Sequence, residues 1–262
     1  MELTDKVIVV TGAAGGIGNA LAMRFHQAGA KHIVCVDIDE AGARETAEAV
    51  GGTGRKLDVT SEADTVTLIE DVEAQIGPID LYCCNAGIST RGGPEVPDEM
   101  WQKIWEINVM AHIWTARHLV PRMIARGGGY FLITASAAGL LSQVGSAPYA
   151  VTKHAAVAFA EWLALTYGDD GIKVSTLCPQ AVRTNMTKGK EDGVASVNGM
   201  MEPEPVAEAC LQAIEAETFL VLPHAEVLEY MRRKTADYDR WIGGMRKLNR
   251  TYSPLKSGGG KA

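Results

Sequence analysis

Short runs of apolar, β-branched residues alternate with longer amphipathic stretches along most of the chain. This alternation is typical of βαβ units, in which helices connect the strands of a parallel sheet. The predicted strands span residues 7–10, 32–37, 55–57, 81–84, 130–134, 174–177 and 219–222. The predicted helices lie between them, at residues 16–28, 40–50, 62–75, 100–126, 149–167 and 205–216.

About seven strands joined by right-handed crossovers would place helices on both faces of the sheet. The fold class is therefore expected to be α/β, a single-domain, Rossmann-like, doubly wound parallel sheet. A chain of 262 residues is within the size that such a sheet reaches as one domain. We expect the dinucleotide-binding and catalytic domain to span residues 1–250.

Two stretches interrupt the alternation. Residues 187–205 are rich in Gly, Met, Glu and Pro without a strong period, which predicts a long mobile loop, and we expect a substrate loop at about residues 185–205. From His224 onward the chain predicts a helix containing Tyr230, Tyr238 and Trp241. The glycine-rich tail at residues 251–262 is expected to be disordered.

Composition excludes several classes of function. Hydrophobic residues make up 47% of the chain, but no apolar run reaches the ~18 residues that a membrane span needs, and no secretory signal is visible. We expect a cytoplasmic protein. A net charge of -7 argues against a nucleic-acid partner. The basic triplet Arg232, Arg233 and Lys234 is interpreted as a solvated helix face, with an anion site as the alternative.

Cysteine and histidine spacing gives no sign of a metal site. The five cysteines lack metal-ligand spacing, and the six histidines include no pair at i, i+4. The cysteines are expected to be reduced thiols, most of them in the core.

A glycine-rich turn follows the first predicted strand and opens the first predicted helix. In the run from Thr11 to Gly18, Gly12 allows a tight turn, while Gly16 and Gly18 let backbone and helix approach a pyrophosphate. Asp37 ends the second strand, 19 residues beyond Gly18, where a carboxylate accepts hydrogen bonds from ribose hydroxyls and repels a 2′-phosphate. The pattern predicts a dinucleotide site with NAD as the cofactor.

Tyr149 and Lys153 stand four residues apart in a predicted helix, so both side chains project from one face. A phenol has a pKa of ~10, and a nearby ammonium group lowers that pKa toward the range useful for base catalysis. The pair is therefore a candidate acid/base centre.

Taken together, these motifs resemble those of the short-chain dehydrogenase/reductase family, over roughly the first 185 residues and in outline beyond. The resemblance rests on Thr11-Gly-x-x-x-Gly-x-Gly18, Asn85-Ala86-Gly87 and Tyr149-x-x-x-Lys153, with Ser136 placed 13 residues before the tyrosine. It implies that Tyr149 exchanges a proton with the substrate oxygen and that Ser136 hydrogen-bonds that oxygen. Lys153 would lower the tyrosine pKa and bind the nicotinamide ribose, and Asn108 would hold a water in a proton relay.

The same resemblance implies further cofactor contacts. They are Ile17 at the phosphates, the adenine-contacting Asp58 and Val59, the motif Asn85, Ala86 and Gly87, and the nicotinamide segment Pro179, Val182 and Thr184. Two positions depart from the family pattern: Cys84 replaces a common asparagine, and Gln180 replaces a common glycine after the proline. The glutamine is expected to narrow the pocket or to hydrogen-bond the substrate.

The predicted substrate residues are mostly apolar, which favours a hydrophobic secondary alcohol or ketone. They are Ala138, Leu140, Val144, Gln180 and Met186, with Met200 and Met201 added by position. Two alternatives stay open, a 3-oxoacyl thioester reductase and a non-catalytic dinucleotide-binding regulator of the same fold. The apolar helices at residues 100–126 and 149–167 also predict a homodimer or homotetramer.

Overall fold

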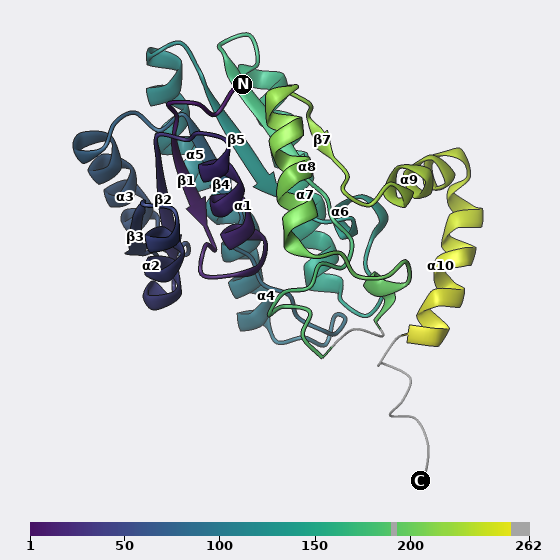
Figure 1. Cartoon of the computed structure of the whole chain (residues 1–262). Coiled ribbons are helices and arrows are strands. Elements are labelled where there is room, and N and C mark those ends of the chain that lie inside the picture. Colours follow the sequence, from purple (N-terminus) through teal and green to yellow (C-terminus); the bar gives the residue numbers. More distant parts are fainter. Residues whose placement is uncertain (190–192, 253–262) are drawn as a thin grey trace.

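The computed structural model describes residues 1–189 and 193–252. Its centre is one sheet of seven parallel strands in the order β3-β2-β1-β4-β5-β6-β7 (Figure 1). The strands are β1 Val7–Thr11, β2 His32–Asp37, β3 Thr53–Lys56, β4 Leu81–Cys84, β5 Gly129–Thr134, β6 Ile172–Leu177 and β7 Leu220–Val221. The chain builds outward from β1 to β3 and returns to β4, which opens a crevice between the carboxyl ends of β1 and β4. The predicted α/β fold class is confirmed.

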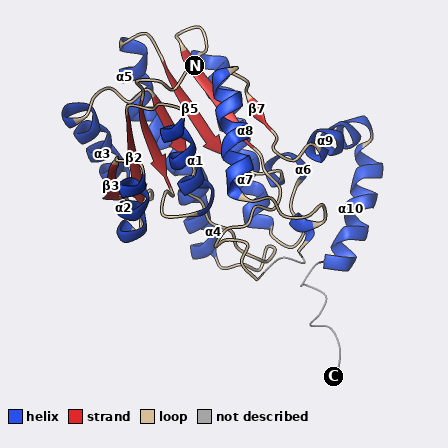
Figure 2. Ribbon diagram, viewed as in Figure 1, coloured by secondary structure: helices blue, strands red, loops and turns tan. Residues whose placement is uncertain are grey.

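Helices cover both faces of this sheet (Figure 2). One layer contains α1 and α8, and the other contains α3, α5 and α7. The helical segments are α1 Gly16–Gln27, α2 Glu40–Ala49, α3 Glu62–Gln75, α4 Asp98–Trp105, η1 Glu106–Met110, α5 Ala111–Ala125, α6 Ala138–Leu141, α7 Ala147–Tyr167, η2 Val194–Ser196, α8 Pro203–Glu215, α9 Glu226–Ala236 and α10 Tyr238–Tyr252.

The alternation of side chains along each strand explains the two cores. In β1, Ile8 and Val10 pack with the layer of α1 and α8, whereas Val7 and Val9 pack with the layer of α3, α5 and α7. Since both faces are buried, the strand must be apolar at every position, as its sequence shows.

The structure divides two of the predicted helices. The stretch at 100–126 contains α4, the π-helical η1 and then α5, so it is not one regular helix. The C-terminal helix is also split, because Asp237 leaves the helical conformation and its carboxylate accepts a hydrogen bond from the Arg240 amide at 2.9 Å. The short helix α6 was not predicted, because four residues carry no readable period.

The pair α9 and α10 lies beside the carboxyl edge of the sheet, apart from both helix layers (Figure 1). Helix α10 extends to Tyr252, and the rest of the predicted tail, residues 253–262, lies outside the described residues. In the described part of the chain, no helix is long and apolar enough to span a membrane. Nor do residues 1–189 and 193–252 contain a His, Cys, Asp or Glu cluster fit for a metal ion.

Candidate active site

A cavity of about 1640 Å³ extends along the carboxyl edge of the sheet. Segments that follow β1, β2, β4, β5 and β6 line it, together with parts of α7, α9 and α10. Ligand pockets commonly enclose roughly 300–1,000 Å³, so this space is large enough for a dinucleotide and a second molecule.

The glycine-rich turn forms one end of the cavity. Gly12 and Gly16 have φ values of 68° and 54°, in the left-handed region that favours glycine. A Cβ on Gly18 would lie 2.0 Å from the Gly12 carbonyl oxygen, so Gly18 acts by allowing close packing and does not itself line the cavity. Ile17 does line it.

The start of α1 is suited to an anion. Among the described residues, no side chain caps α1 at Gly15 and no acidic residue lies in its first turn. By contrast, Asp39 caps α2 and Ser61 caps α3 through side-chain hydrogen bonds. The first amides of α1 are therefore left for a phosphate group, as a dinucleotide site requires.

Thr11 and Asn85 fasten this turn to the neighbouring strand ends. The Thr11 hydroxyl accepts hydrogen bonds from the amides of Asn85 and Ala86 at 2.9 and 3.0 Å. The Asn85 side chain donates to the Thr11 carbonyl at 3.0 Å and accepts from the Thr134 hydroxyl at 3.2 Å. Three strand ends are thus held in fixed relative positions, and Asn85, Ala86 and Gly87 line the cavity.

The three residues predicted to contact the adenosine differ in their placement. Asp37 lines the cavity, and its carboxylate accepts hydrogen bonds from the amides of Ala14 at 3.1 Å and Asp39 at 3.0 Å. Asp58 and Val59 follow β3 at the same edge of the sheet but do not line the cavity. The Asp58 carboxylate instead accepts hydrogen bonds from the amide and hydroxyl of Thr60, at 2.9 and 2.7 Å.

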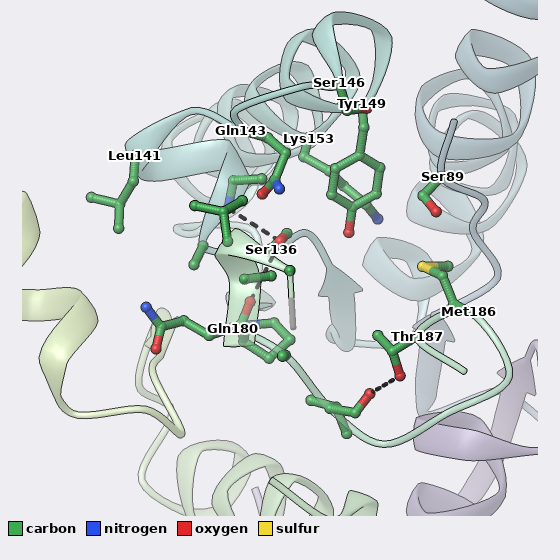
Figure 3. A pocket seen from close by; sticks show the side chains of 18 of the residues that line it. Ser89, Ser136, Leu141, Gln143, Ser146, Tyr149, Lys153, Gln180, Met186 and Thr187 are labelled. Atoms are coloured by element: carbon green, nitrogen blue, oxygen red, sulfur yellow. Dashed lines mark hydrogen bonds between the residues drawn. The ribbon is translucent and has the colours of Figure 1, made fainter. Parts of the chain in front are cut away.

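Ser136, Tyr149 and Lys153 come together at the centre of the cavity. Figure 3 shows the Tyr149 hydroxyl pointing into the open space, with the Lys153 amine beside it and Ser136 facing it. The Lys153 amine lies 5.8 Å from the centre of the Tyr149 ring and donates a hydrogen bond to the Thr134 carbonyl at 2.8 Å. The Ser136 hydroxyl accepts from the Ala138 amide at 3.1 Å, which fixes its orientation.

Asn108 supports this centre from the π-helical segment η1. It is fully buried and does not line the cavity. Its amide group donates to the Ile88 carbonyl at 3.0 Å and to the Thr152 hydroxyl at 3.1 Å, and its carbonyl accepts from the Ile88 amide at 3.0 Å. Asn108 therefore ties the segment after β4 to the turn of α7 that carries Lys153. The extra residue of a π-helical turn is often found at functional sites.

Burial dominates the protonation of these groups. It raises the pKa of Tyr149, although the hydrogen-bonding Ser136 hydroxyl lowers that pKa in part. Burial also lowers the pKa of Lys153 from 10.5 to about 8, and it lowers the pKa of the neighbouring His112 to about 3. At neutral pH the structure thus holds a neutral phenol, a protonated lysine and a neutral imidazole. The spacing of Tyr149 and Lys153 predicted a lowered tyrosine pKa, whereas burial raises this pKa in the structure.

The buried lysine makes a testable contribution to stability. Between pH 8 and 10.5 the unfolded chain keeps the Lys153 proton and the folded chain loses it, so the free energy of unfolding rises with pH. We expect the wild type to gain about 2 kcal/mol relative to Lys153→Met between about pH 7 and pH 9.5. Urea unfolding at each pH measures the difference.

The exposed Lys103 provides the control, since Lys103→Met should show no comparable change relative to the wild type over the same pH range. A difference between wild type and Lys153→Met that stays constant with pH would show that burial does not shift this lysine.

Only some of the residues predicted to contact the substrate line the cavity. Ala138, Val144, Gln180 and Met186 line the cavity. Leu140 does not, because its side chain packs into the apolar clusters and its carbonyl accepts from Lys234 at 2.6 Å. Met200 and Met201 do not line it either, and Met201 pairs with Val182 through a β-bridge. In the nicotinamide segment Pro179, Val182 and Thr184 all line the cavity.

Several residues that line the cavity were not predicted from the sequence. Leu141, Gln143 and Ser146 precede the tyrosine, and α9 and α10 add Tyr230, Trp241, Met245 and Leu248. The spacing of 241, 245 and 248 is a readable helical stripe, but nothing in it says which part of the fold it faces. Cys84, at the position of a common family asparagine, is buried, and burial raises its pKa to about 12, so its thiol stays neutral.

Comparison with known proteins gives three consistent matches. The short chain dehydrogenase family model matches residues 6–195. A 1-deoxy-11-beta-hydroxypentalenate dehydrogenase of Streptomyces exfoliatus is 35% identical over 252 residues, covering 92% of this chain and 91% of the relative. Epidermal retinol dehydrogenase 2 of Homo sapiens is 30% identical over 233 residues, covering 85% of this chain and 75% of the relative.

A solved structure agrees with these sequence matches. The structure of a short chain dehydrogenase/reductase from Burkholderia phymatum in complex with NAD superposes with a TM-score of 0.82 at 26% identity. The superposition covers 91% of this chain and 96% of that one.

Proposed function

The chain belongs to the short-chain dehydrogenase family, and on that premise we propose that it transfers a hydride between NAD(H) and a hydrophobic secondary alcohol or its ketone, with Tyr149 as acid and base. The observation that carries this proposal is a single cavity in which the Tyr149 hydroxyl, Ser136 and Lys153 lie next to the glycine-rich turn. When bound, the nicotinamide accepts or supplies the hydride.

The side chains transfer the proton and hold the substrate oxygen in place. In alcohol oxidation the Tyr149 oxygen takes the hydroxyl proton as the hydride leaves the carbon, and in ketone reduction it returns that proton. Ser136 donates a hydrogen bond to the same substrate oxygen and holds it against the phenol. Lys153 stabilises the phenolate form by its positive charge and binds the nicotinamide ribose.

We assign Asn108 a positioning role, since its hydrogen bonds to Ile88 and Thr152 hold the segments that carry Gly87 and Lys153. The water relay implied by the family resemblance stays a prediction.

The preference for NAD rests on Asp37. Its carboxylate borders the cavity at the end of β2, where the ribose of the adenosine half would lie if the pyrophosphate occupied the start of α1. A negative charge at that place accepts hydrogen bonds from ribose hydroxyls and repels a 2′-phosphate.

An apolar substrate is supported by the cavity wall. Ala138, Leu141, Val144 and Met186 line the same cavity as Tyr149. The names of the relatives, a hydroxypentalenate dehydrogenase and a retinol dehydrogenase, also refer to alcohols.

The direct test is an assay of the unchanged protein. Formation of reduced nicotinamide is followed by absorbance with NAD and with NADP against aliphatic, cyclic, aromatic and steroid alcohols. We expect turnover with NAD and with apolar secondary alcohols. Binding of NAD without turnover of any alcohol would instead favour the non-catalytic regulator.

We also propose that copies of the chain associate through the outer face of α7. On this helix Trp162 is 52% exposed and Leu165 is 85% exposed, which is unusual for large apolar side chains. Light scattering is expected to give a dimer or tetramer for the wild type and a smaller species for Leu165→Glu. Leu228→Glu on α9 is the control and should leave the mass unchanged. A wild-type monomer at micromolar concentration would contradict the proposal.

A cytoplasmic location is the last element of the proposal. All five cysteines are free and buried, which suits a reducing compartment.

A further inference from the structure

Helix α10 borders the cavity without belonging to the packed body of the protein. None of its residues is buried. With α9 it is anchored by a small apolar cluster of its own, in which Tyr230 and Trp241 pack against Ala137, Leu141 and Val227. Ala137 directly follows Ser136, so the anchor lies next to the catalytic centre.

One face of α10 lines the cavity and is mostly apolar, with Arg240 and Thr251 as its polar members. It carries Trp241, Met245, Leu248 and Tyr252, which follow one another by four, three and four residues and so form one stripe. Gly244 lies within this stripe, and the neighbouring Ile242 and Gly243 face away from the cavity. Trp241, Met245 and Leu248 are half-buried, while Ile242 is 51% exposed, which agrees with an inner and an outer face.

A chain of contacts holds this helix to the substrate side of the cavity. The rings of Trp241 and Tyr230 lie 6.4 Å apart. The Tyr230 hydroxyl and the Asn198 side chain exchange hydrogen bonds at 3.0 and 3.2 Å, and Asn198 also donates to the Gln180 side chain at 3.4 Å. These contacts connect the stripe, through Tyr230 and Asn198, to Gln180, which lies in the same pocket as Tyr149 (Figure 3).

We propose that the stripe of α10 binds the apolar body of the substrate, and that the enzyme therefore selects large apolar secondary alcohols over small ones. This inference rests on the proposed function, because it assigns the substrate of the same site. A small alcohol held at Ser136 and Tyr149 would leave the stripe in contact with water, whereas a large apolar alcohol would cover it and gain the free energy of apolar burial. Trp241, Met245 and Leu248 are the specificity-determining residues.

Two adjacent glycines allow a matched test. A Cβ on either Gly243 or Gly244 would meet no atom within 4 Å, so a side chain can begin at both positions without a clash, but only Gly244 lines the cavity. The measured quantity is the ratio of kcat/KM for estradiol to kcat/KM for cyclohexanol, with NAD. Gly244→Leu is expected to lower this ratio about 10-fold, mainly by raising KM for the steroid, because the added side chain occupies its space. Gly243→Leu should leave the ratio unchanged.

A second pair tests the loss of contact. Leu248→Ala should lower the same ratio several-fold, and Ile242→Ala on the outer face should not. If both leucine variants change the ratio equally, or neither does, the role of the stripe is refuted.

Normal kinetics in all four variants, combined with loss of binding to phosphatidylcholine vesicles in Leu248→Ala, would assign the stripe to a lipid surface instead. If the wild type turns over neither alcohol with NAD, the proposed function itself fails, which is a separate result.

Discussion

Replacing Tyr149 by Phe is expected to lower kcat for alcohol oxidation by a factor of about 10³, while NAD still binds with nearly unchanged affinity. Phenylalanine keeps the ring that faces Lys153 and removes only the hydroxyl that takes the substrate proton. Since burial raises the pKa of Tyr149, wild-type oxidation should accelerate as the pH rises above neutrality, because the deprotonated phenol is the base. The variant should lose that rise.

Two measurements separate this effect from a general disturbance of the site. Titration with NADH, followed by its fluorescence, reports cofactor binding independently of turnover. Tyr167→Phe removes a hydroxyl from a tyrosine of the same helix that does not line the cavity, and it should retain most of the activity. Equal kcat in Tyr149→Phe and the wild type would rule out the proposed proton transfer.

Replacing Asp37 by Asn should change the choice of cofactor. The ratio of kcat/KM with NAD to kcat/KM with NADP is expected to fall about 100-fold, because a charged acceptor for the ribose is lost and the repulsion of a 2′-phosphate disappears. Part of the loss with NAD would come from the turn itself, since the Asp37 carboxylate accepts the amide of Ala14.

Asp39 supplies a matched control for charge at this end of the cavity. It also lines the cavity, and Asp39→Asn removes the same charge while keeping an oxygen that can cap α2. We expect a much smaller change in the cofactor ratio for this variant. A wild type that prefers NADP, or equal effects of the two substitutions, would contradict the role given to Asp37.

Most of the fold was predictable from the chain because its signals are local. The strand at 7–10 is apolar at each position and the glycines follow at once, so strand, turn and helix can be located without knowledge of their neighbours. The irregularities were not predictable in this way. The π-helical turn at Asn108 depends on hydrogen bonds to Ile88 and Thr152, which lie 20 and 44 residues away.

The features of the site likewise divide into those set by local spacing and those set by contacts between distant segments. The four-residue spacing of Tyr149 and Lys153 fixes their common face before any tertiary contact forms. Their protonation does not follow from spacing, because burial by the surrounding strands and helices raises one pKa and lowers the other. The surroundings of the basic triplet are also seen only in the structure. Lys234 donates a hydrogen bond to the Leu140 carbonyl, and Arg233 forms an ion pair with Glu229. The Arg233 side chain is 65% exposed, so its pair with Glu229 agrees with the predicted solvated helix face, whereas Lys234 is half-buried.

By itself, the sequence located the strands, the glycine-rich turn, the Tyr149–Lys153 pair and the carboxylate at the end of β2, because each depends on residues close together in the chain. Only the tertiary structure decided which side chains share the cavity. In the structure Leu140, Asp58 and Val59 do not line the cavity. Trp241, Met245 and Leu248, from the far end of the chain, do line it. The physical reason is that periodicity fixes the face of a helix, whereas the partner of that face is set by packing between segments remote in sequence.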